Sequence, residues 1–231
     1  MSKHVLITGG NKGIGLKTTQ LFLDLNFKVT VLARNTSSIK SYKNCSRIDY
    51  DLSKVEGIKD LISSMEPVDI LINNAGIMNT YSYSDYPNDK KDEMLRINLE
   101  APVELITHVS QHMIKNNYGR IVNNTSIAGQ IGHPDIWYGM SKAALINATK
   151  SFAKLLGPHG IVINAIAPGP VKTDLMNVIP EERKNSMLKT FYSNRFAEPE
   201  EIAKTILWLA TECPEYINGT CLDINNGAFP R

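Results

Sequence analysis

The sequence predicts an α/β fold with one doubly wound parallel sheet of about seven strands, flanked by helices on both faces. Three observations predict it. Short, almost continuously apolar segments alternate along the chain with longer segments of helical period. Apolar strands of this kind are buried on both faces, as in parallel sheets. A glycine-rich turn follows the first strand, and no repeat, linker or shift in composition divides residues 1–231 into separate domains.

The composition is that of an ordinary globular protein and excludes several classes. Of 231 residues, 42% are hydrophobic and 21% charged, which excludes a disordered chain. The net charge is +2, so no strong field draws nucleic acid or an anionic membrane. No apolar run approaches the ~18 residues of a membrane span, and we expect no signal peptide because Lys3 and His4 lead directly into the first strand. The widely spaced Cys45, Cys213 and Cys221 predict no metal site and a reducing, cytoplasmic location.

The elements of the first half follow from periodicity and β-branched content. Ile14, Leu21 and Phe22 recur on one face of the first helix, which opens in the glycine-rich turn. A capping box from Ser53 to Glu56 predicts the start of the second helix. In order, we expect strand 5–7, helix 13–25, strand 27–33, strand 48–50, helix 53–65 and strand 68–72.

The second half contains a long helix and three further strands. Residues 89–116 read as one helix, which Pro102 should kink because proline has no N–H to donate. Pro199 stands in the first turn of the last helix, where proline is tolerated. In order, we expect helix 89–116, strand 120–123, helix 137–156, strand 161–167, helix 199–211 and strand 219–224.

The glycine-rich turn predicts a site for the phosphates of a dinucleotide. It runs from Thr8 to Gly15, directly after the first strand and at the start of the first helix. Glycines let the backbone approach a pyrophosphate, to which the helix N-terminus offers free N–H groups. A glycine-rich turn without a ligand is the alternative for this motif alone. We expect cofactor contacts from Gly9, Asn11, Lys12, Gly13, Ile14 and Gly15.

The charge at the end of the second strand favours NADP(H) over NAD(H). Proteins that prefer NAD carry Asp or Glu about 20 residues after the glycine turn, to hold the ribose 2′-OH. Here the strand ends at Ala33 and Arg34. Arg34 could bind a 2′-phosphate through a charge-assisted fork, with Lys12 as a second cation. The alternative, two solvated surface cations, leaves the missing acid unexplained.

Tyr138 and Lys142 predict acid–base chemistry because residues at i and i+4 share one face of a helix. A phenol titrates near ~10, and a neighbouring ammonium lowers that pKa. Tyr138 could then exchange a proton with a substrate oxygen that Ser126 polarises. Asn98 lies just before Pro102, where freed backbone groups could hold a water. For the Tyr–Lys pair alone, a half-exposed tyrosine beside a solvated lysine is the alternative.

In this order and spacing, these residues resemble the short-chain dehydrogenase/reductase family, which has a single NAD(P)-binding Rossmann domain. The match covers almost the whole chain. It implies that Tyr138 donates the proton, Ser126 orients the carbonyl, Lys142 lowers the Tyr138 pKa and holds the nicotinamide ribose, and Asn98 anchors a water. It also implies a homotetramer or homodimer. Besides the glycine turn, Arg34, Tyr138 and Lys142, the implied cofactor residues are Asp51, Leu52, Asn74, Ala75, Gly76, Pro168, Gly169, Val171 and Thr173.

Within the family, the C-terminal third most resembles the 3-oxoacyl-[acyl-carrier-protein] reductase group, through residues 168–174, 195–203, 217–219 and 225–227. This implies reduction of a 3-oxoacyl thioester with NADPH, as in fatty acid biosynthesis. The two basic residues with which that group grips its carrier protein are replaced here by Asn117 and His159, although Lys115 lies near the first. Acyl carrier protein therefore stays open as a partner. The alternative substrate is another small ketone, a sugar or a secondary alcohol.

We expect residues 173–195 to form a lid over the substrate. Packing of the same apolar side chains on the protein's own core is an equal alternative. His133 and Trp137 flank the catalytic residues and could line the substrate pocket, as could Ile127. A dinucleotide-binding sensor without catalysis is a hypothesis of another class, against which the intact catalytic set argues. The apolar lid residues are Met176, Met187, Leu188, Phe191 and Tyr192.

Overall fold

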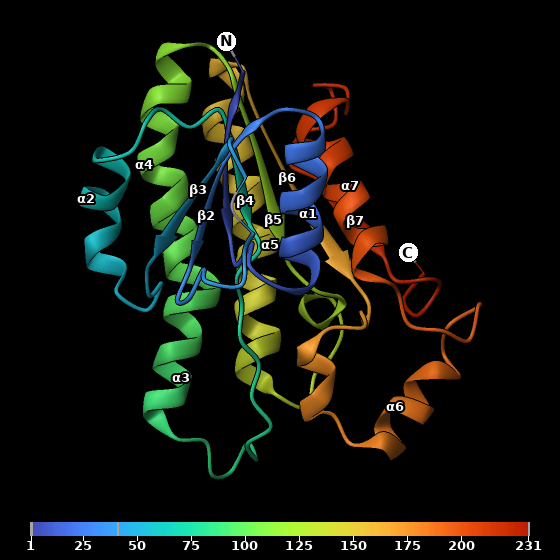
Figure 1. Cartoon of the computed structure of the whole chain (residues 1–231). Coiled ribbons are helices and arrows are strands. Elements are labelled where there is room, and N and C mark those ends of the chain that lie inside the picture. Colours follow the sequence, from blue (N-terminus) through green and yellow to red (C-terminus); the bar gives the residue numbers. More distant parts are fainter. Residues whose placement is uncertain (1, 41, 231) are drawn as a thin grey trace.

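The computed structural model describes residues 2–40 and 42–230, and its centre is a seven-stranded parallel sheet (Figure 1). The strand order is β3-β2-β1-β4-β5-β6-β7, so the chain starts in the middle and winds outward in both directions. The predicted doubly wound fold is confirmed. The strands are β1 His4–Thr8, β2 Lys28–Ala33, β3 Cys45–Asp49, β4 Ile70–Asn73, β5 Gly119–Asn124, β6 Ile161–Pro168 and β7 Cys221–Ile224.

Helices cover both faces of this sheet (Figure 1). On one face α1 packs against α7, and on the other α4 lies between α2 and α5. The short helix α6 lies beyond the carboxyl ends of the strands (Figure 1). The helices are α1 Gly13–Asp24, α2 Ile58–Ser63, α3 Asn88–Leu95, α4 Ala101–Lys115, α5 Ile136–Leu156, α6 Glu181–Leu188 and α7 Pro199–Thr211.

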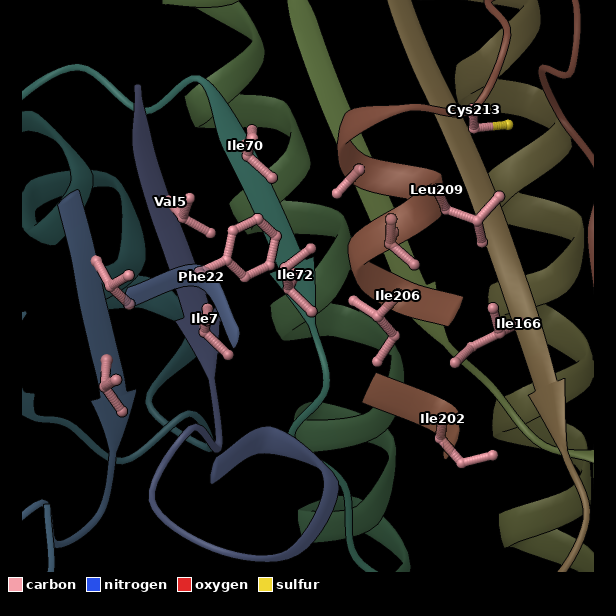
Figure 2. Close-up of a cluster of buried hydrophobic side chains, with 14 of the residues drawn as sticks. Val5, Ile7, Phe22, Ile70, Ile72, Ile166, Ile202, Ile206, Leu209 and Cys213 are labelled. Atoms are coloured by element: carbon pink, nitrogen blue, oxygen red, sulfur yellow. The ribbon is translucent and has the colours of Figure 1, made fainter. Parts of the chain in front are cut away.

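Alternate residues of the central strands supply two separate hydrophobic cores. Val5 and Ile7 of β1 belong to the core under α1 and α7, whereas Leu6 belongs to the core on the opposite face. Figure 2 shows the first core, to which Phe22 of α1 and Ile206 of α7 both contribute. Because strand side chains alternate with a period of two, a sheet buried on both faces requires the continuous apolar runs seen in the sequence.

The long helix before β5 contains a π-helical turn where the sequence predicts a kink. From α3 the helix runs through Arg96–Glu100 directly into α4. Pro102 has no N–H, so the carbonyl of Asn98, four residues earlier, lacks its usual α-helical donor. A single wider turn absorbs this misfit and keeps the helix continuous. Asn98 therefore sits within the irregular turn.

The capping box predicted at Ser53 is wrong. The backbone N–H of Ser53 donates to the Asp51 carboxylate at 3.0 Å, and the chain enters a 3₁₀ turn, Val55–Gly57, ahead of α2. An aspartate two residues upstream competes for the same backbone donor and forms an Asx turn. A reciprocal capping box does start α7, between Glu198 and Glu201.

Among the strands, the third shows the largest boundary error. It was predicted at 48–50, but β3 begins at Cys45 and pairs with β2 along its whole length. As an edge strand it leaves Ser46 and Arg47 exposed, so it lacks the apolar run on which the prediction depends. Within the described residues, no helix has the length and apolar character needed to cross a membrane.

Candidate active site

The turn between β1 and α1 has a shape and contacts that only glycine permits. Gly9 and Gly13 have φ values of +64° and +51°, in the left-handed region. A Cβ at Gly15 would overlap the carbonyl oxygen of Gly9. The helix therefore starts in direct contact with the turn, and its first turn carries no acidic side chain. The N–H groups and positive dipole end of α1 are thus available to an anion.

The end of β4 is fastened to this glycine turn. The Thr8 hydroxyl accepts hydrogen bonds from the backbone N–H groups of Asn74, at 2.9 Å, and Ala75, at 3.0 Å. In return, Asn74 Nδ2 donates to the carbonyl oxygens of Thr8 and Gly9, at 3.0 and 3.2 Å. Strands β1 and β4 are neighbours at the point where the strand order reverses. Doubly wound sheets bind their ligands at this point.

A groove of about 340 Å³ lies at this edge of the sheet. Five predicted cofactor residues lie outside its described lining. Gly169 lines a second cavity, and Val171 forms a bridge with Ala197. The other three are Pro168, Tyr138 and Lys142. Predicted residues that line the groove are Gly9, Asn11, Lys12, Gly13, Ile14, Gly15, Arg34, Asp51, Leu52, Asn74, Ala75, Gly76 and Thr173.

Several residues that line the groove were missed by sequence reasoning. Most of them directly follow or precede a predicted contact, so the signal was their position at the carboxyl end of a strand. They are Leu32, Ala33, Asn35, Tyr50, Ile77, Ile97, Asn124, Asp174 and Leu175.

Among the missed residues, Asn124 carries an unpaired acceptor. Its Nδ2 donates to Asn74 Oδ1 at 3.0 Å, whereas its own Oδ1 is buried without a hydrogen-bond partner in the described part of the chain. Leaving a buried carbonyl unpaired costs about 1–3 kcal/mol. A ligand with a donor would relieve this cost. Together with the glycine cradle, this orphaned oxygen fits a dinucleotide bound along the groove.

Two cations reach the groove from its outer part. Arg34 follows β2 and lines the groove. The pKa of Asp51 is lowered mainly by the hydrogen bond from the N–H of Ser53, and the charge of Arg34 lowers it further. Lys12 Nζ lies 3.3 Å from the Asp174 carboxylate, and both side chains are about two-thirds exposed, 68% and 69%. Exposed ion pairs of this kind contribute only about 0–1 kcal/mol. Lys12 can therefore exchange Asp174 for a phosphate at little cost.

Tyr138 and Lys142 lie on one face of α5, where the sequence places them. Lys142 is only 4% exposed, and its Nζ donates to the backbone carbonyl of Asn124 at 3.0 Å. The same Nζ lies 5.8 Å from the centre of the Tyr138 ring. A Cβ at Gly76, in the groove wall, would lie 3.3 Å from Nζ. The ammonium group is therefore close to both the groove wall and the phenol ring.

The pKa of Tyr138 is raised, whereas the sequence led us to expect Lys142 to lower it. Burial of the phenol is the largest cause, a hydrogen bond with Ser126 acts in the opposite direction, and the charge of Asp135 raises the pKa further. Lys142 is not among the causes of this shift, and burial lowers its own pKa to about 8. The phenol therefore carries a proton at neutral pH, but its raised pKa makes it a weaker acid than a free tyrosine.

Asn98 and Ser126 both make contacts that organise the backbone around the site. Asn98 is fully buried, and its amide pairs with Ile77 in both directions, each hydrogen bond measuring 2.9 Å. Its Nδ2 also donates to the Ser141 hydroxyl at 3.2 Å. Ser126 Oγ accepts from the N–H of Ala128 at 3.1 Å. The role of Asn98 as a water anchor stays a prediction, whereas its side chain clearly braces the chain after β4.

A buried carboxylate that sequence reasoning missed, Asp135, joins α5 to the loop after β4. One carboxylate oxygen accepts from the N–H of Tyr138 at 3.1 Å and so caps the helix. The other accepts from the N–H of Asn79 at 2.9 Å and from the hydroxyl of Tyr86 at 3.4 Å. The available signal was an aspartate directly before a helical pattern. Asp135 thus sets the position of the segment that carries Tyr138.

In the expected lid, residues 173–195, some of the apolar side chains are buried and others are exposed to solvent. Met176 and Phe191 are buried, Met187 and Leu188 are partly buried, and Tyr192 is 76% exposed. From α6, the Arg183 guanidinium lies 3.4 Å from His133 Nε2. The His133 ring is itself 5.2 Å from that of Tyr138, centre to centre. Helix α6 therefore contacts the wall beside the phenol.

Known proteins resemble this chain over nearly its whole length. The family model for short chain dehydrogenase matches residues 3–184. The 3-oxoacyl-[acyl-carrier-protein] reductase FabG of Rickettsia bellii is 34% identical over 228 residues, which is 96% of this chain and 95% of that protein. Among solved structures, ElxO with NADP bound has a TM-score of 0.90 at 31% identity, covering 100% of both chains. 4-Hydroxyisoleucine dehydrogenase complexed with NADH has a TM-score of 0.94 at 28% identity, covering 99% of both.

Proposed function

Because this chain belongs to the short-chain dehydrogenase/reductase family, we propose that it is an NADP(H)-dependent oxidoreductase that reduces a ketone to a secondary alcohol. One observation carries the proposal: the buried ammonium of Lys142 lies close both to the groove wall at Gly76 and to the phenol ring of Tyr138. The first candidate substrate is a 3-oxoacyl thioester. The C-terminal motifs and the Rickettsia relative, named a 3-oxoacyl-[acyl-carrier-protein] reductase, support it.

Binding of the cofactor would be divided among the residues that line the groove. The N–H groups at the start of α1 would hold the pyrophosphate, and Arg34 would hold the 2′-phosphate. Lys142 would donate to the nicotinamide ribose. When bound, the nicotinamide would supply the hydride, while the protein supplies orientation and electrostatics.

Proton transfer would fall to Tyr138. The phenol is protonated at neutral pH because tyrosine ordinarily titrates near ~10, so it can donate to the carbonyl oxygen as negative charge develops there. Ser126 would donate a hydrogen bond to the same oxygen. Lys142 would stabilise the phenolate that remains, and its pKa of about 8 makes it a ready source of the replacement proton. Asn98 would keep the chain at Ile77 in place throughout.

The preference for NADP(H) is supported by charge. Arg34 lines the outer part of the groove, and Asp51, the nearby carboxylate, is already engaged by the N–H of Ser53. Similar proteins are found with either cofactor, since ElxO has NADP bound and 4-hydroxyisoleucine dehydrogenase is complexed with NADH. NAD(H) is therefore the comparison in every cofactor test.

A small ketone without a carrier protein is the second candidate substrate, and a specific observation favours it. Asn117 and Gly160 are neighbours, because a Cβ at Gly160 would lie 2.5 Å from the Asn117 carbonyl oxygen. Asn117 and His159, the positions expected to bind an acidic carrier protein, therefore lie near each other just before β5 and β6. Neither side chain is a permanent cation. Acyl carrier protein and assembly into a homodimer or homotetramer remain part of the first proposal.

The test is NADPH oxidation by the purified protein, with acetoacetyl thioester as substrate, a panel of small ketones alongside and NADH in parallel. We expect turnover with NADPH to exceed turnover with NADH. Activity on the thioester supports the first candidate, whereas activity on small ketones alone selects the second. Absence of turnover with every ketone, despite NADPH binding, would contradict the proposed reaction.

A further inference from the structure

We propose that Asn124 is a further cofactor-binding residue, whose side-chain Oδ1 accepts a hydrogen bond from the nicotinamide riboside half of the dinucleotide. This inference rests on the proposed function, because it concerns the same groove. It is carried by a buried acceptor that has no partner among the described residues, on a residue that lines the groove. It adds a polar contact from β5 that none of the sequence motifs contains.

The orientation of the Asn124 amide is fixed by its neighbours. Asn74 Nδ2 faces the carbonyl oxygens of Thr8 and Gly9, which can only accept, so Asn74 must present its oxygen on the other side. That oxygen needs a donor, and Asn124 supplies its Nδ2 at 3.0 Å. If the Asn124 amide were flipped, its oxygen would face the oxygen of Asn74. If the Asn74 amide were flipped, its oxygen would face the carbonyl oxygens of Thr8 and Gly9. Asn124 Oδ1 is therefore the end of the amide that points away from Asn74.

The location of Asn124 distinguishes it from two other residues with an unpaired buried oxygen. Asn73 and Gln130 also have one, but neither belongs to the described lining of the groove. Asn124 does, and its backbone carbonyl holds the Lys142 ammonium at 3.0 Å. The residue would then serve the site twice, through its backbone toward Lys142 and through its side chain toward the cofactor.

The place of the acceptor along the groove decides which half of the cofactor it meets. Arg34 and Asp51 mark the outer part, which would take the adenosine 2′-phosphate. Asn124 lies instead at the end of β5, beside Lys142 and next to the chain that leads to Ser126. The nearby donors of a dinucleotide are the nicotinamide carboxamide NH₂ and the hydroxyls of its ribose. A defect at Asn124 should therefore spare ligands that consist only of the adenosine half.

The experiment measures dissociation constants of NADPH and adenosine 2′,5′-bisphosphate for the wild type, Asn124→Leu and Asn124→Val. Leucine matches the size of asparagine and valine suits a strand, and neither offers an acceptor. Both leave the backbone carbonyl that holds Lys142. We expect the NADPH dissociation constant to rise on the order of 5- to 10-fold, as for loss of one hydrogen bond. Binding of the bisphosphate should not change.

Asn123→Val is the matched control. Asn123 precedes Asn124 on β5, but its amide pairs with Asn73 and Thr149 in the interior, at 2.9 Å each. This substitution should lower stability and leave the ratio of the two dissociation constants unchanged. Retained bisphosphate binding also shows that each Asn124 variant is folded at the groove.

Equal NADPH affinity in the wild type and both Asn124 variants would overturn the inference. So would a parallel loss of both ligands, which would indicate a structural role only. Failure of the wild type to bind NADPH or NADH would instead contradict the proposed function. A 3-acetylpyridine analogue of NADPH, which lacks the carboxamide NH₂, identifies the donor. If the effect of the Asn124 variants disappears with the analogue, the donor is the carboxamide, and if the effect persists, the donor is a ribose hydroxyl.

Discussion

The two halves of the candidate active site are held together in different ways. The dinucleotide region, made of residues 8–15 and 73–76, is fixed by backbone contacts: glycine turns, the Thr8 hydroxyl and the carbonyl oxygens that bind Asn74. The substrate region, made of residues 79–87, 133–138 and 173–195, is joined by side chains such as Asp135 and Arg183. Tyr138 stands where the two regions meet.

This difference explains why the sequence predicts the cofactor of the dinucleotide region but not the substrate of the substrate region. Backbone contacts leave few residue types possible, because almost any side chain at Gly15 would collide with Gly9. Contacts between side chains of three separate segments can be replaced one by one without altering the sheet. Cofactor chemistry can therefore be inferred from motifs, whereas the identity of the ketone cannot.

Tyr138→Phe should give the largest effect, because it should abolish most of the turnover while leaving NADPH binding intact. Removing the proton donor should lower kcat about 100- to 10,000-fold. The NADPH dissociation constant should stay within about two-fold, because the dinucleotide region is untouched. Steady-state rates and a fluorescence titration on the same preparation check this. A protein whose turnover survives the substitution would not use Tyr138 as its acid.

Gly15→Ala should break the dinucleotide region itself. The added methyl group would push α1 away from Gly9, and overpacking of this kind costs about 1–3 kcal/mol, or up to roughly 100-fold in NADPH affinity. The control is Gly132→Ala, since no atom lies within 4 Å of a Cβ built there. NADPH titrations of both variants decide the matter. Equal loss in the two, or loss in neither, would contradict the account of the glycine turn.

Arg34→Ala should show which residue of the dinucleotide region distinguishes NADPH from NADH. Loss of one exposed charge-assisted contact should weaken NADPH binding roughly 10- to 30-fold and leave NADH binding unchanged. The difference should shrink at high salt, because exposed charges are screened. Competition titrations at two salt concentrations measure both effects. An equal change for both cofactors would rule out Arg34 as the 2′-phosphate contact.

The smallest expected effect concerns stability alone: besides its loss of activity, Lys142→Met should change how the free energy of unfolding depends on pH. The folded-state pKa of Lys142, about 8, lies below its unfolded value near 10.4, so the unfolded chain binds more protons between those limits. Stability of the wild type relative to the variant should therefore rise by about 1–2 kcal/mol from pH 8 to pH 9.5. Urea unfolding at both pH values measures it. A difference that stays constant would mean that Lys142 titrates normally.

Local patterns in the sequence were enough for the fold and for most of the dinucleotide region. Continuous apolar strands predicted a sheet buried on both faces, and the glycine spacing predicted the turn before α1. The capping box at Ser53 was wrong because Asp51, two residues upstream, competes for the same N–H. The kink at Pro102 became a π turn because the long helix stays continuous on both sides.

The remaining features depend on contacts that no local pattern contains. The free oxygen of Asn124 follows from the orientation of Asn74, fifty positions away in the chain. The raised pKa of Tyr138 follows from burial, which the Tyr–Lys spacing does not indicate. Asp135 acts through Asn79, which lies fifty-six positions earlier. Sequence reasoning identified the chemical groups, and the fold determines how strongly each is perturbed.

The measurement that tests the central claim most directly is a fluorescence titration of the wild-type protein with NADPH, in the absence of any ketone, with NADH as the comparison. If the dinucleotide region is a complete site by itself, NADPH should bind saturably at one site per chain. NADH should bind more weakly, on the order of ten-fold, for lack of the 2′-phosphate contact with Arg34. If neither cofactor bound without a ketone, the account would be contradicted, because the dinucleotide region would then depend on the substrate region.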